Sequence, residues 1–299
     1  MRTGHPQRKL RRSTMARWAT LPIGAAATTI LAGCTQQQMQ GFLPGGPEVT
    51  NHTGDVISMW VNSWIVLLAV GVVTWVLILW AAVVYRRRKG QTGFPVQLRY
   101  NMPIEVFYTI VPLILVIGFF AFTAREQADI EAPFDDGPDV TIEVYGKRWA
   151  WDFNYVDEDV YSAGVQAQER LDGDGGIDTD RLPVLYLPVD QKVEIRIESR
   201  DVIHSFWVID FLYKKDMIPA KTNYMYFIPT QEGTYQGKCA ELCGEYHSLM
   251  LFEVEVVSQA EYDAYIESLR DAGNVGQLGP EYNVNQNLPG VTGVSEGDE

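Results

Sequence analysis

The sequence predicts two membrane-spanning helices followed by an all-β domain, folded as a sandwich or Greek-key barrel. Three observations support this. Two long apolar segments lie in the first half, runs that alternate apolar with polar residues fill the second, and charge is unevenly divided. Residues 1–125 contain 12 Lys/Arg and 3 Asp/Glu, whereas residues 126–299 contain 12 Lys/Arg and 35 Asp/Glu. The acidic half argues against nucleic acid as a partner, because phosphate binding requires a basic surface.

Residues 1–33 are interpreted as an export signal. Basic residues precede a small, apolar stretch from Ala19 to Leu31, which runs into Ala-Gly and then Cys34. Small residues before a cysteine at the end of an apolar run are similar to a bacterial lipoprotein cleavage site. We therefore expect cleavage before Cys34 and lipid attachment to it, with an uncleaved signal anchor as the alternative. The Gln-, Gly- and Pro-rich residues 34–55 are expected to form a linker.

Residues 56–125 are predicted to form a transmembrane helical hairpin. The apolar segments Val56–Tyr85 and Pro103–Ala124 are long enough to cross a bilayer, which takes about 20 residues. The loop between them is basic and has no acidic residue, so it is expected in the cytoplasm. Its cations are Arg86, Arg87, Arg88, Lys89 and Arg99. The N-terminus and everything after Arg125 then face outward from the plasma membrane. A buried helical hairpin in a soluble protein is the alternative.

Residues 126–272 are predicted to form the β domain. Segments such as Val140–Tyr155, Lys192–Ser199 and Leu249–Val257 alternate apolar with polar residues, and Gly, Pro and Asp clusters separate them. Short strands with turn signals favour a sandwich or Greek-key barrel. A short closing helix is expected over residues 258–273, and residues 273–299 are expected to form a flexible acidic tail.

The segment CAELCGEYHSLM, residues 239–250, carries two thiols, an imidazole and a thioether. One helix face could align them, but strand-like runs flank the segment, and Gly237 and Gly244 interrupt it. A disulfide is compatible with an exported domain, yet it leaves the His and the Met unexplained. Thiolate, imidazole and thioether together favour copper. The four residues are Cys239, Cys243, His247 and Met250.

A metal site in this segment needs a further ligand from elsewhere in the domain. His204 is the only other histidine in the outer half, and it closely follows the predicted strand Lys192–Ser199. A histidine in apolar surroundings is usually a packed core residue. Because there is a single candidate, we expect His204 to face the two thiols.

These residues together resemble subunit II of the haem–copper cytochrome c oxidases. The similarity runs from about Asn51 to Ile266. The pattern Cys-x-Glu-x-Cys-x-x-x-His-x-x-Met is complete, and the upstream histidine stands in Asp-Val-Ile-His-Ser-Phe-Trp. The resemblance implies that two membrane helices carry an outer cupredoxin-like domain with a binuclear copper centre, CuA, over residues 126–272.

The resemblance further implies six ligands to the two copper ions: two bridging thiolates, two imidazoles, a weakly bound thioether and a backbone carbonyl. In that order they are Cys239 and Cys243, His204 and His247, Met250, and Glu241. The carboxylate of Glu241 would reach toward a magnesium ion at the junction with subunit I. A solvated loop acid is the alternative for that side chain.

Two further segments resemble the family. In Tyr145–Tyr155, Trp149 would be the ring that receives electrons from cytochrome c, with core packing as the alternative. Trp151, Phe153 and Tyr155 alternate with it and are expected to fill the sandwich. The segment from Asn101 resembles the start of the second helix, with Tyr108 where a Trp is usual. Glu105 would be a candidate entrance to a proton path, or a carboxylate that stabilises the first helical turn.

The resemblance implies one subunit of a proton-translocating respiratory oxidase. Single electrons from a soluble or tethered cytochrome c would pass to haem a in subunit I for O2 reduction, and subunit III is a further partner. The four histidines of this chain do not suffice for the haem–copper site. The alternatives are a quinol-oxidase-type subunit II, a nitrous oxide reductase, and a lipid-anchored binding module with a Cys239–Cys243 disulfide. The first lacks the copper ligands, and the second is a larger enzyme without the hairpin.

Overall fold

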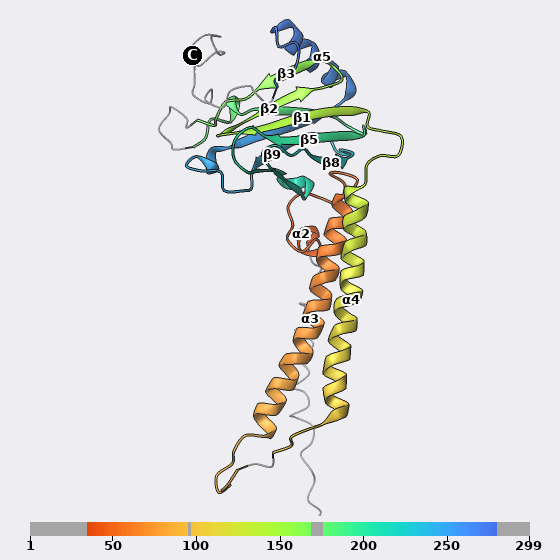
Figure 1. The fold of residues 1–299 in the computed structure, drawn as a ribbon, viewed down its shortest axis with the longest axis vertical. Coiled ribbons are helices and arrows are strands. Elements are labelled where there is room, and N and C mark those ends of the chain that lie inside the picture. The colour runs from red at the N-terminus through yellow and green to blue at the C-terminus, as the bar shows by residue number, and fades with distance from the viewer. Residues whose placement is uncertain (1–34, 95–96, 169–175, 280–299) are drawn as a thin grey trace, which may run out of the picture. The chain divides into compact units, whose positions relative to one another are not determined.

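The computed structural model describes residues 35–94, 97–168 and 176–279 (Figure 1). The chain divides into two units, residues 1–42 and 43–299. The described part of the first contains helix α2, Gln36–Met39, whose N-terminus is capped by Thr35. The predicted export signal, its cleavage site at Cys34 and residues 280–299 lie outside the described residues.

Two helices, α3 (Thr53–Val84) and α4 (Met102–Glu131), are long and apolar enough to cross a membrane. Their most apolar windows have mean hydropathies of 2.7 and 2.3, and no residue of either window is buried. A helix of about 30 residues is roughly 45 Å long, which exceeds the hydrocarbon thickness of a bilayer. Helix α4 continues beyond Arg125, the end of the predicted hairpin.

The described part of the β domain contains two five-stranded sheets. The first runs in the order β3 (Val160–Ala163), β2 (Ala150–Tyr155), β1 (Val140–Lys147), β5 (Val193–Ser199) and β8 (Asn223–Phe227). The second runs β4 (Val184–Pro188), β10 (Leu251–Val257), β9 (Gly233–Cys239), β6 (His204–Val208) and β7 (Tyr213–Met217). The pairs β1–β5 and β4–β10 are parallel, and the rest are antiparallel. Together with the two apolar helices, this confirms the predicted fold class of a helical pair followed by an all-β sandwich.

The core lies between the sheets. Strands β5 and β10 bury every second residue, as their alternating sequences predict. Strand β2 is buried along its whole length. Its Trp151 and Phe153 pack against Phe252 of β10, with ring centroids 5.0 and 6.1 Å away. The aromatic residues of β2 therefore fill the sandwich, as expected.

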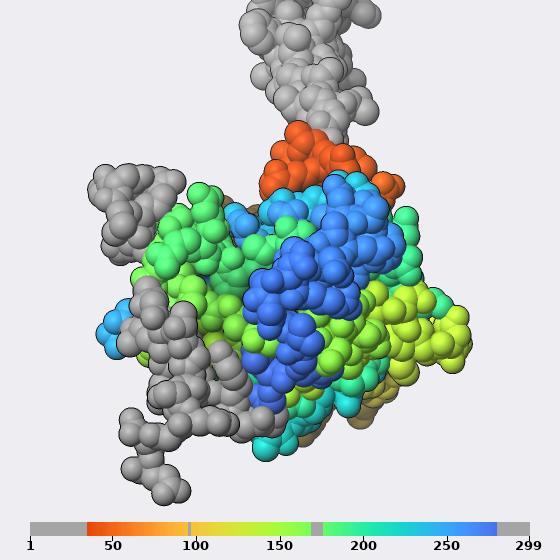
Figure 2. Space-filling view, turned by 90° about the horizontal axis from the view of Figure 1, so that it is seen from above, coloured from red at the N-terminus to blue at the C-terminus, as the bar shows by residue number. Residues whose placement is uncertain are grey.

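Helix α5 (Gln259–Asp271) closes one end of the sandwich, in agreement with the predicted closing helix. Ser258 and Glu261 form a capping box at its N-terminus. The helix is coloured blue on the face seen in Figure 2. Tyr262 and Tyr265 of α5 pack edge-on against the buried ring of Tyr155.

The residues after α5 are bonded to the first sheet. The amide of Tyr161 donates to the carbonyl of Asn274, and the amide of Gly276 donates to the carbonyl of Asp159. Buried Asn154 both accepts from the amide of Leu278, at 3.0 Å, and donates to its carbonyl, at 2.9 Å. The beginning of the predicted tail thus pairs with polar groups of strand β2.

Candidate metal centre

The ends of three strands of the second sheet bring sulfur and nitrogen atoms together. His204 is the first residue of β6, Cys239 is the last of β9, and Met250 directly precedes β10. Pairing of β6 with β9 places Phe206 opposite Cys239, and the amide of Cys239 donates to the carbonyl of Met250 at 3.0 Å. The loop of residues 240–249 carries the other candidate ligands back to the same end of the sheet.

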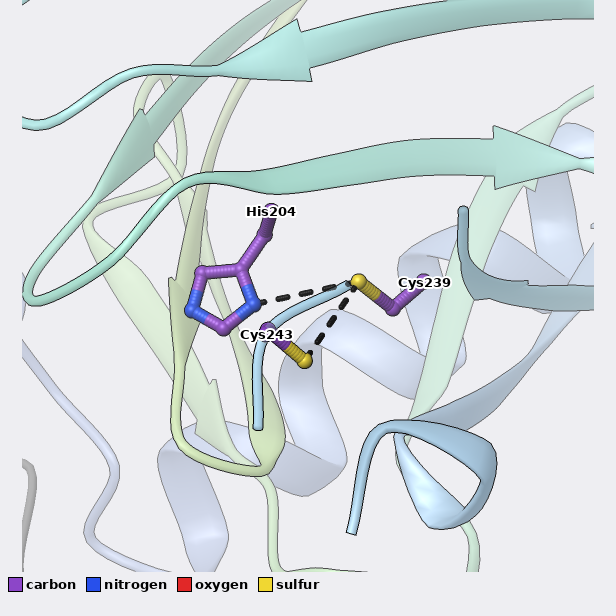
Figure 3. A group of neighbouring side chains, drawn as sticks. All are labelled: His204, Cys239 and Cys243. Carbon is purple, nitrogen blue, oxygen red and sulfur yellow. Dashed lines mark hydrogen bonds between the residues drawn. The ribbon is translucent and has the colours of Figure 1, made fainter. Parts of the chain in front are cut away.

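The side chains of His204, Cys239 and Cys243 point toward one another (Figure 3). Cys239 Sγ lies 3.8 Å from His204 Nδ1 and 3.8 Å from Cys243 Sγ. Cys243 Sγ lies 3.4 Å from His247 Nδ1 and 3.8 Å from Met250 Sδ. Two ligands bonded to one ion at about 2.2 Å and a tetrahedral angle lie roughly 3.6 Å apart. The spacing of this cluster therefore suits soft metal ions.

The cluster contains thiols and not a disulfide. The distance of 3.8 Å between the two sulfurs far exceeds the roughly 2.05 Å of a disulfide bond. Cys239 and Cys243 are both buried, at 3% and 4% exposure, so water is largely excluded from the sulfurs. The segment is also not a helix: its helical part is one 3-10 turn, His247–Leu249.

The surroundings of the two thiols shift their pKa values in opposite directions. The hydrogen bond with Cys243 and that with His204 lower the pKa of Cys239, against the effect of burial. The pKa of Cys243 is raised, because the same contact between the sulfurs opposes a second negative charge there. Thiolates are the form of cysteine that binds metal, so Cys239 is ready to bind at neutral pH.

Asp201 orients His204 from the side opposite the sulfurs. Its Oδ1 lies 2.8 Å from His204 Nε2, and its Oδ2 accepts from the backbone amide of Arg148 at 2.8 Å. Burial alone would raise the pKa of Asp201, but these hydrogen bonds lower it overall. Burial would likewise lower the pKa of His204, but Asp201 and Cys239 raise it. A carboxylate bonded to Nε2 leaves Nδ1 free for a metal.

Gly146 allows strand β1 to approach the imidazole. A methyl group at this position would lie 3.1 Å from Cδ2 of His204 and 3.3 Å from Cε of Met217. Any larger residue would therefore displace the ring. Sequence reasoning singled out neither Gly146 nor Asp201. The spacing Asp-x-x-His was visible in the sequence, but nothing in it showed that the carboxylate bonds to the ring.

Trp149 lies half-buried against the ligand loop. Its Nε1 donates to the carbonyl of Cys243 at 3.2 Å. Its ring meets that of Tyr246 edge-on, with centroids 4.8 Å apart. Gly244 permits this contact, since a methyl group there would lie 3.3 Å from the indole. Tyr246 is 39% exposed and was not identified from the sequence.

Two acidic residues named from the sequence occupy different surroundings. The backbone carbonyl oxygen of Glu241 lies 3.2 Å from Sγ of Cys239, and Glu241 is exposed. The carboxylate of Glu241 makes no hydrogen bond or ion pair with any residue that the structure describes. Glu105 accepts from the backbone amide of Asn101 at 2.8 Å, at the start of α4. This contact fits a carboxylate that stabilises the first helical turn. Cys34 lies outside the described residues.

Several known proteins are similar in sequence to this chain. Residues 140–257 match the family model of the cytochrome c oxidase subunit II periplasmic domain. A probable cytochrome c oxidase subunit 2 from Streptomyces avermitilis is 38% identical, over 91% of this chain and 92% of its own length. Cytochrome c oxidase subunit 2 from Mycobacterium tuberculosis is 32% identical, over 90% of this chain and 85% of its own.

A solved structure is also similar. It is the crystal structure of the periplasmic domain of subunit II of cytochrome oxidase, CoxB, from Bradyrhizobium japonicum. That domain is 29% identical, and the match covers 45% of this chain and 96% of that domain, with a TM-score of 0.40.

Proposed function

Because this chain belongs to the cytochrome c oxidase subunit II family, we propose that it accepts single electrons from a cytochrome c and passes them to haem a in subunit I. It is a subunit of an oxidoreductase complex, and the family binds copper in its CuA centre. The observation that carries the proposal is the convergence of two thiols, two imidazoles and a thioether at one end of the second sheet.

The donor set suits two copper ions, which when bound would supply a one-electron acceptor. Cys239, Cys243, His204 and His247 would be the main residues that hold the ions, because thiolate and imidazole are favoured ligands of copper. The thioether and one backbone carbonyl would be the weaker ligands. These two are Met250 and Glu241. Their atoms already lie within 3.2–3.8 Å of a cysteine sulfur.

The surrounding residues hold this ligand set in place. Cysteine binds metal as the thiolate, so both sulfurs would already be deprotonated in the loaded site and neither would have a proton to release when the redox state changes. Asp201 fixes the tautomer and orientation of His204. Burial of the sulfurs excludes water. A rigid, dry site of this kind needs little rearrangement when an electron arrives or leaves.

Trp149 is proposed as the residue that receives the electron. Its half-buried ring reaches the surface, and its N–H donates to the backbone carbonyl of the proposed ligand Cys243, so a single hydrogen bond connects the surface ring to the metal site. The acidic outer half, with 35 Asp/Glu against 12 Lys/Arg after residue 125, would steer a basic cytochrome c toward this surface.

The remaining assignments are proposed on the family premise. Helices α3 and α4 would cross the plasma membrane, with their connecting loop in the cytoplasm and the β domain outside. Cys34 would carry lipid. Glu105 would stand at the entrance of a proton path, and the Glu241 carboxylate would reach a magnesium ion beside subunit I. Reduction of O2, coupled to proton translocation, would take place in subunit I, with subunit III also in the complex.

Metal content tests the proposal against a disulfide-stabilised binding module or a quinol-oxidase-type subunit. Free thiols are first counted in the full-length chain as purified in detergent, and the chain is then reduced, loaded with copper and freed of excess metal. The proposal predicts two copper ions per chain and no disulfide. Cys243→Ser should abolish binding of the pair, whereas Cys34→Ser should leave it intact. An oxidised Cys239–Cys243 pair without bound copper would support the binding module instead.

A further inference from the structure

A cavity borders the C-terminal end of helix α3, and none of its lining residues belongs to the candidate metal centre. Residues 84–88 and 91–94 line this cavity, whose volume is about 770 Å³. They include three consecutive arginines, Arg86, Arg87 and Arg88, and two aromatic rings, Tyr85 and Phe94. The lining residues belong to the end of α3 and to the loop that follows it. This loop lies at the lower end of α3 in Figure 1. The sequence from residue 86 to residue 104 contains no acidic side chain.

The loop is held in shape by Gln91. The side-chain oxygen of Gln91 accepts from the backbone amide of Arg88 at 2.8 Å. The backbone amide of Gln91 donates to the carbonyl of Arg88 at 3.1 Å. The carbonyl of Gln91 accepts from Nε and Nη2 of Arg87, at 3.3 and 3.2 Å. The guanidinium group of Arg87 is therefore bonded within the loop. The guanidinium groups of Arg86 and Arg88 have no hydrogen bond or ion pair with any residue of the described chain.

The surroundings of the two arginines are those of a membrane interface. Arg86 follows directly after Tyr85, whose ring packs edge-on against Trp80 with centroids 5.5 Å apart. Tyr85 is 72% exposed and Phe94 is 99% exposed. Aromatic residues at the end of an apolar span lie at the depth of lipid headgroups. Two cations and two exposed rings therefore border one cavity at that depth.

We propose that this cavity binds the phosphate of an anionic membrane phospholipid, with Arg86 and Arg88 as the contacting cations. The planar guanidinium group matches phosphate oxygens in a two-pronged arrangement. Phe94 and Tyr85 offer apolar surface to the glycerol and acyl region, which a free phosphate ion would not use. The inference rests on the proposed membrane insertion of α3 and α4. It is independent of the metal centre.

Charge-matched variants separate a site from general attraction to the membrane. Arg86→Gln with Arg88→Gln removes the two cavity cations. Lys89→Gln with Arg99→Gln removes two cations of the same loop that do not line the cavity. Binding of the full-length chain to phosphatidylglycerol, at increasing fractions relative to phosphatidylcholine in mixed detergent micelles, is measured by native mass spectrometry. Copper content of each variant is recorded in parallel.

The cavity variant should bind phosphatidylglycerol about 25-fold more weakly than the unchanged chain, at about fivefold for each lost cation. The control variant should lose clearly less. Equal losses in the two variants would overturn the site in favour of general charge attraction. The proposal would also be overturned if millimolar inorganic phosphate or an acidic peptide displaced bound phosphatidylglycerol as effectively as added phosphatidylglycerol does. Normal copper loading in a variant that has lost lipid leaves the electron-transfer proposal intact, so the two fail separately.

Discussion

Nε2 of His204 lies 2.8 Å from Oδ1 of Asp201, while Nδ1 of the same ring faces the sulfur of Cys239 at 3.8 Å. The carboxylate is itself fixed by the backbone amides of Arg148 and Val202. The turn before β2 and the loop before β6 are therefore tied together at the base of one ligand. This contact links the segment proposed to receive electrons with the segment proposed to hold copper.

Replacing Asp201 with Asn should weaken copper binding. The amide keeps the shape of the side chain but not its charge, and it no longer selects the tautomer that presents Nδ1 to the metal. Loss of such an outer contact typically lowers metal affinity by about 10–100-fold. Competition with a chelator measures the effect. Asp136→Asn, at an exposed residue paired with Lys192, is the control. Equal affinities in the two variants would contradict this role.

Gly146→Ala should displace His204. The added methyl group would lie 3.1 Å from the ring and 3.3 Å from Met217, in a fully packed region. Such overpacking typically costs about 1–3 kcal/mol in the free energy of unfolding. We expect a less stable chain that also binds less copper, measured by urea unfolding and metal analysis. Gly46→Ala has open space around it and should change neither quantity. A stable, fully loaded Gly146→Ala chain would argue against the close approach.

Trp149→Phe should slow electron acceptance without removing copper. The substitution deletes the N–H that bonds to the carbonyl of Cys243 and shortens the ring at the surface. Rapid mixing of the assembled oxidase with reduced cytochrome c gives the rate. Trp207→Phe changes another half-buried tryptophan, which packs under Lys238 at 5.0 Å, and should leave the rate unchanged. Similar rates in the two variants would remove Trp149 from the electron path.

Truncation after Gly273 should destabilise the β domain, whereas truncation after Gly279 should not. The longer deletion removes Leu278, whose backbone amide donates to the buried Oδ1 of Asn154, while Nδ2 of Asn154 keeps its hydrogen bond to Glu143. A buried polar group left without partners costs about 1–3 kcal/mol. Urea unfolding of both truncated chains measures the difference. Equal stabilities would mean that residues 274–279 add nothing to the fold.

The patterns that could be predicted from the sequence are local or chemically specific. Apolar length indicated α3 and α4, and the alternation in Val193–Ser199 and Leu251–Val257 indicated strands. The Cys-Cys-His-Met spacing, with a single candidate histidine upstream, predicted which side chains would meet. The positions of Asp201 and Gly146 beside His204 could not be predicted, because both contacts depend on how β1 crosses the loop before β6.

Residues 274–279 illustrate the limit of composition. They are low in apolar content and therefore read as a flexible tail. Only Leu278 is buried among them. Their hydrogen bonds include those to Asn154, Asp159 and Tyr161, whose donors and acceptors are brought together only once β2 and β3 have paired. No property of the tail sequence alone reveals such partners.

Electron paramagnetic resonance of the copper-loaded, full-length chain tests the central claim most directly. If two thiolates and two imidazoles hold a pair of ions, one unpaired electron should be shared, with hyperfine splitting from two equivalent copper nuclei. His204→Ala should destroy that equivalence. A spectrum from a single copper nucleus, unchanged in His204→Ala, would contradict the account.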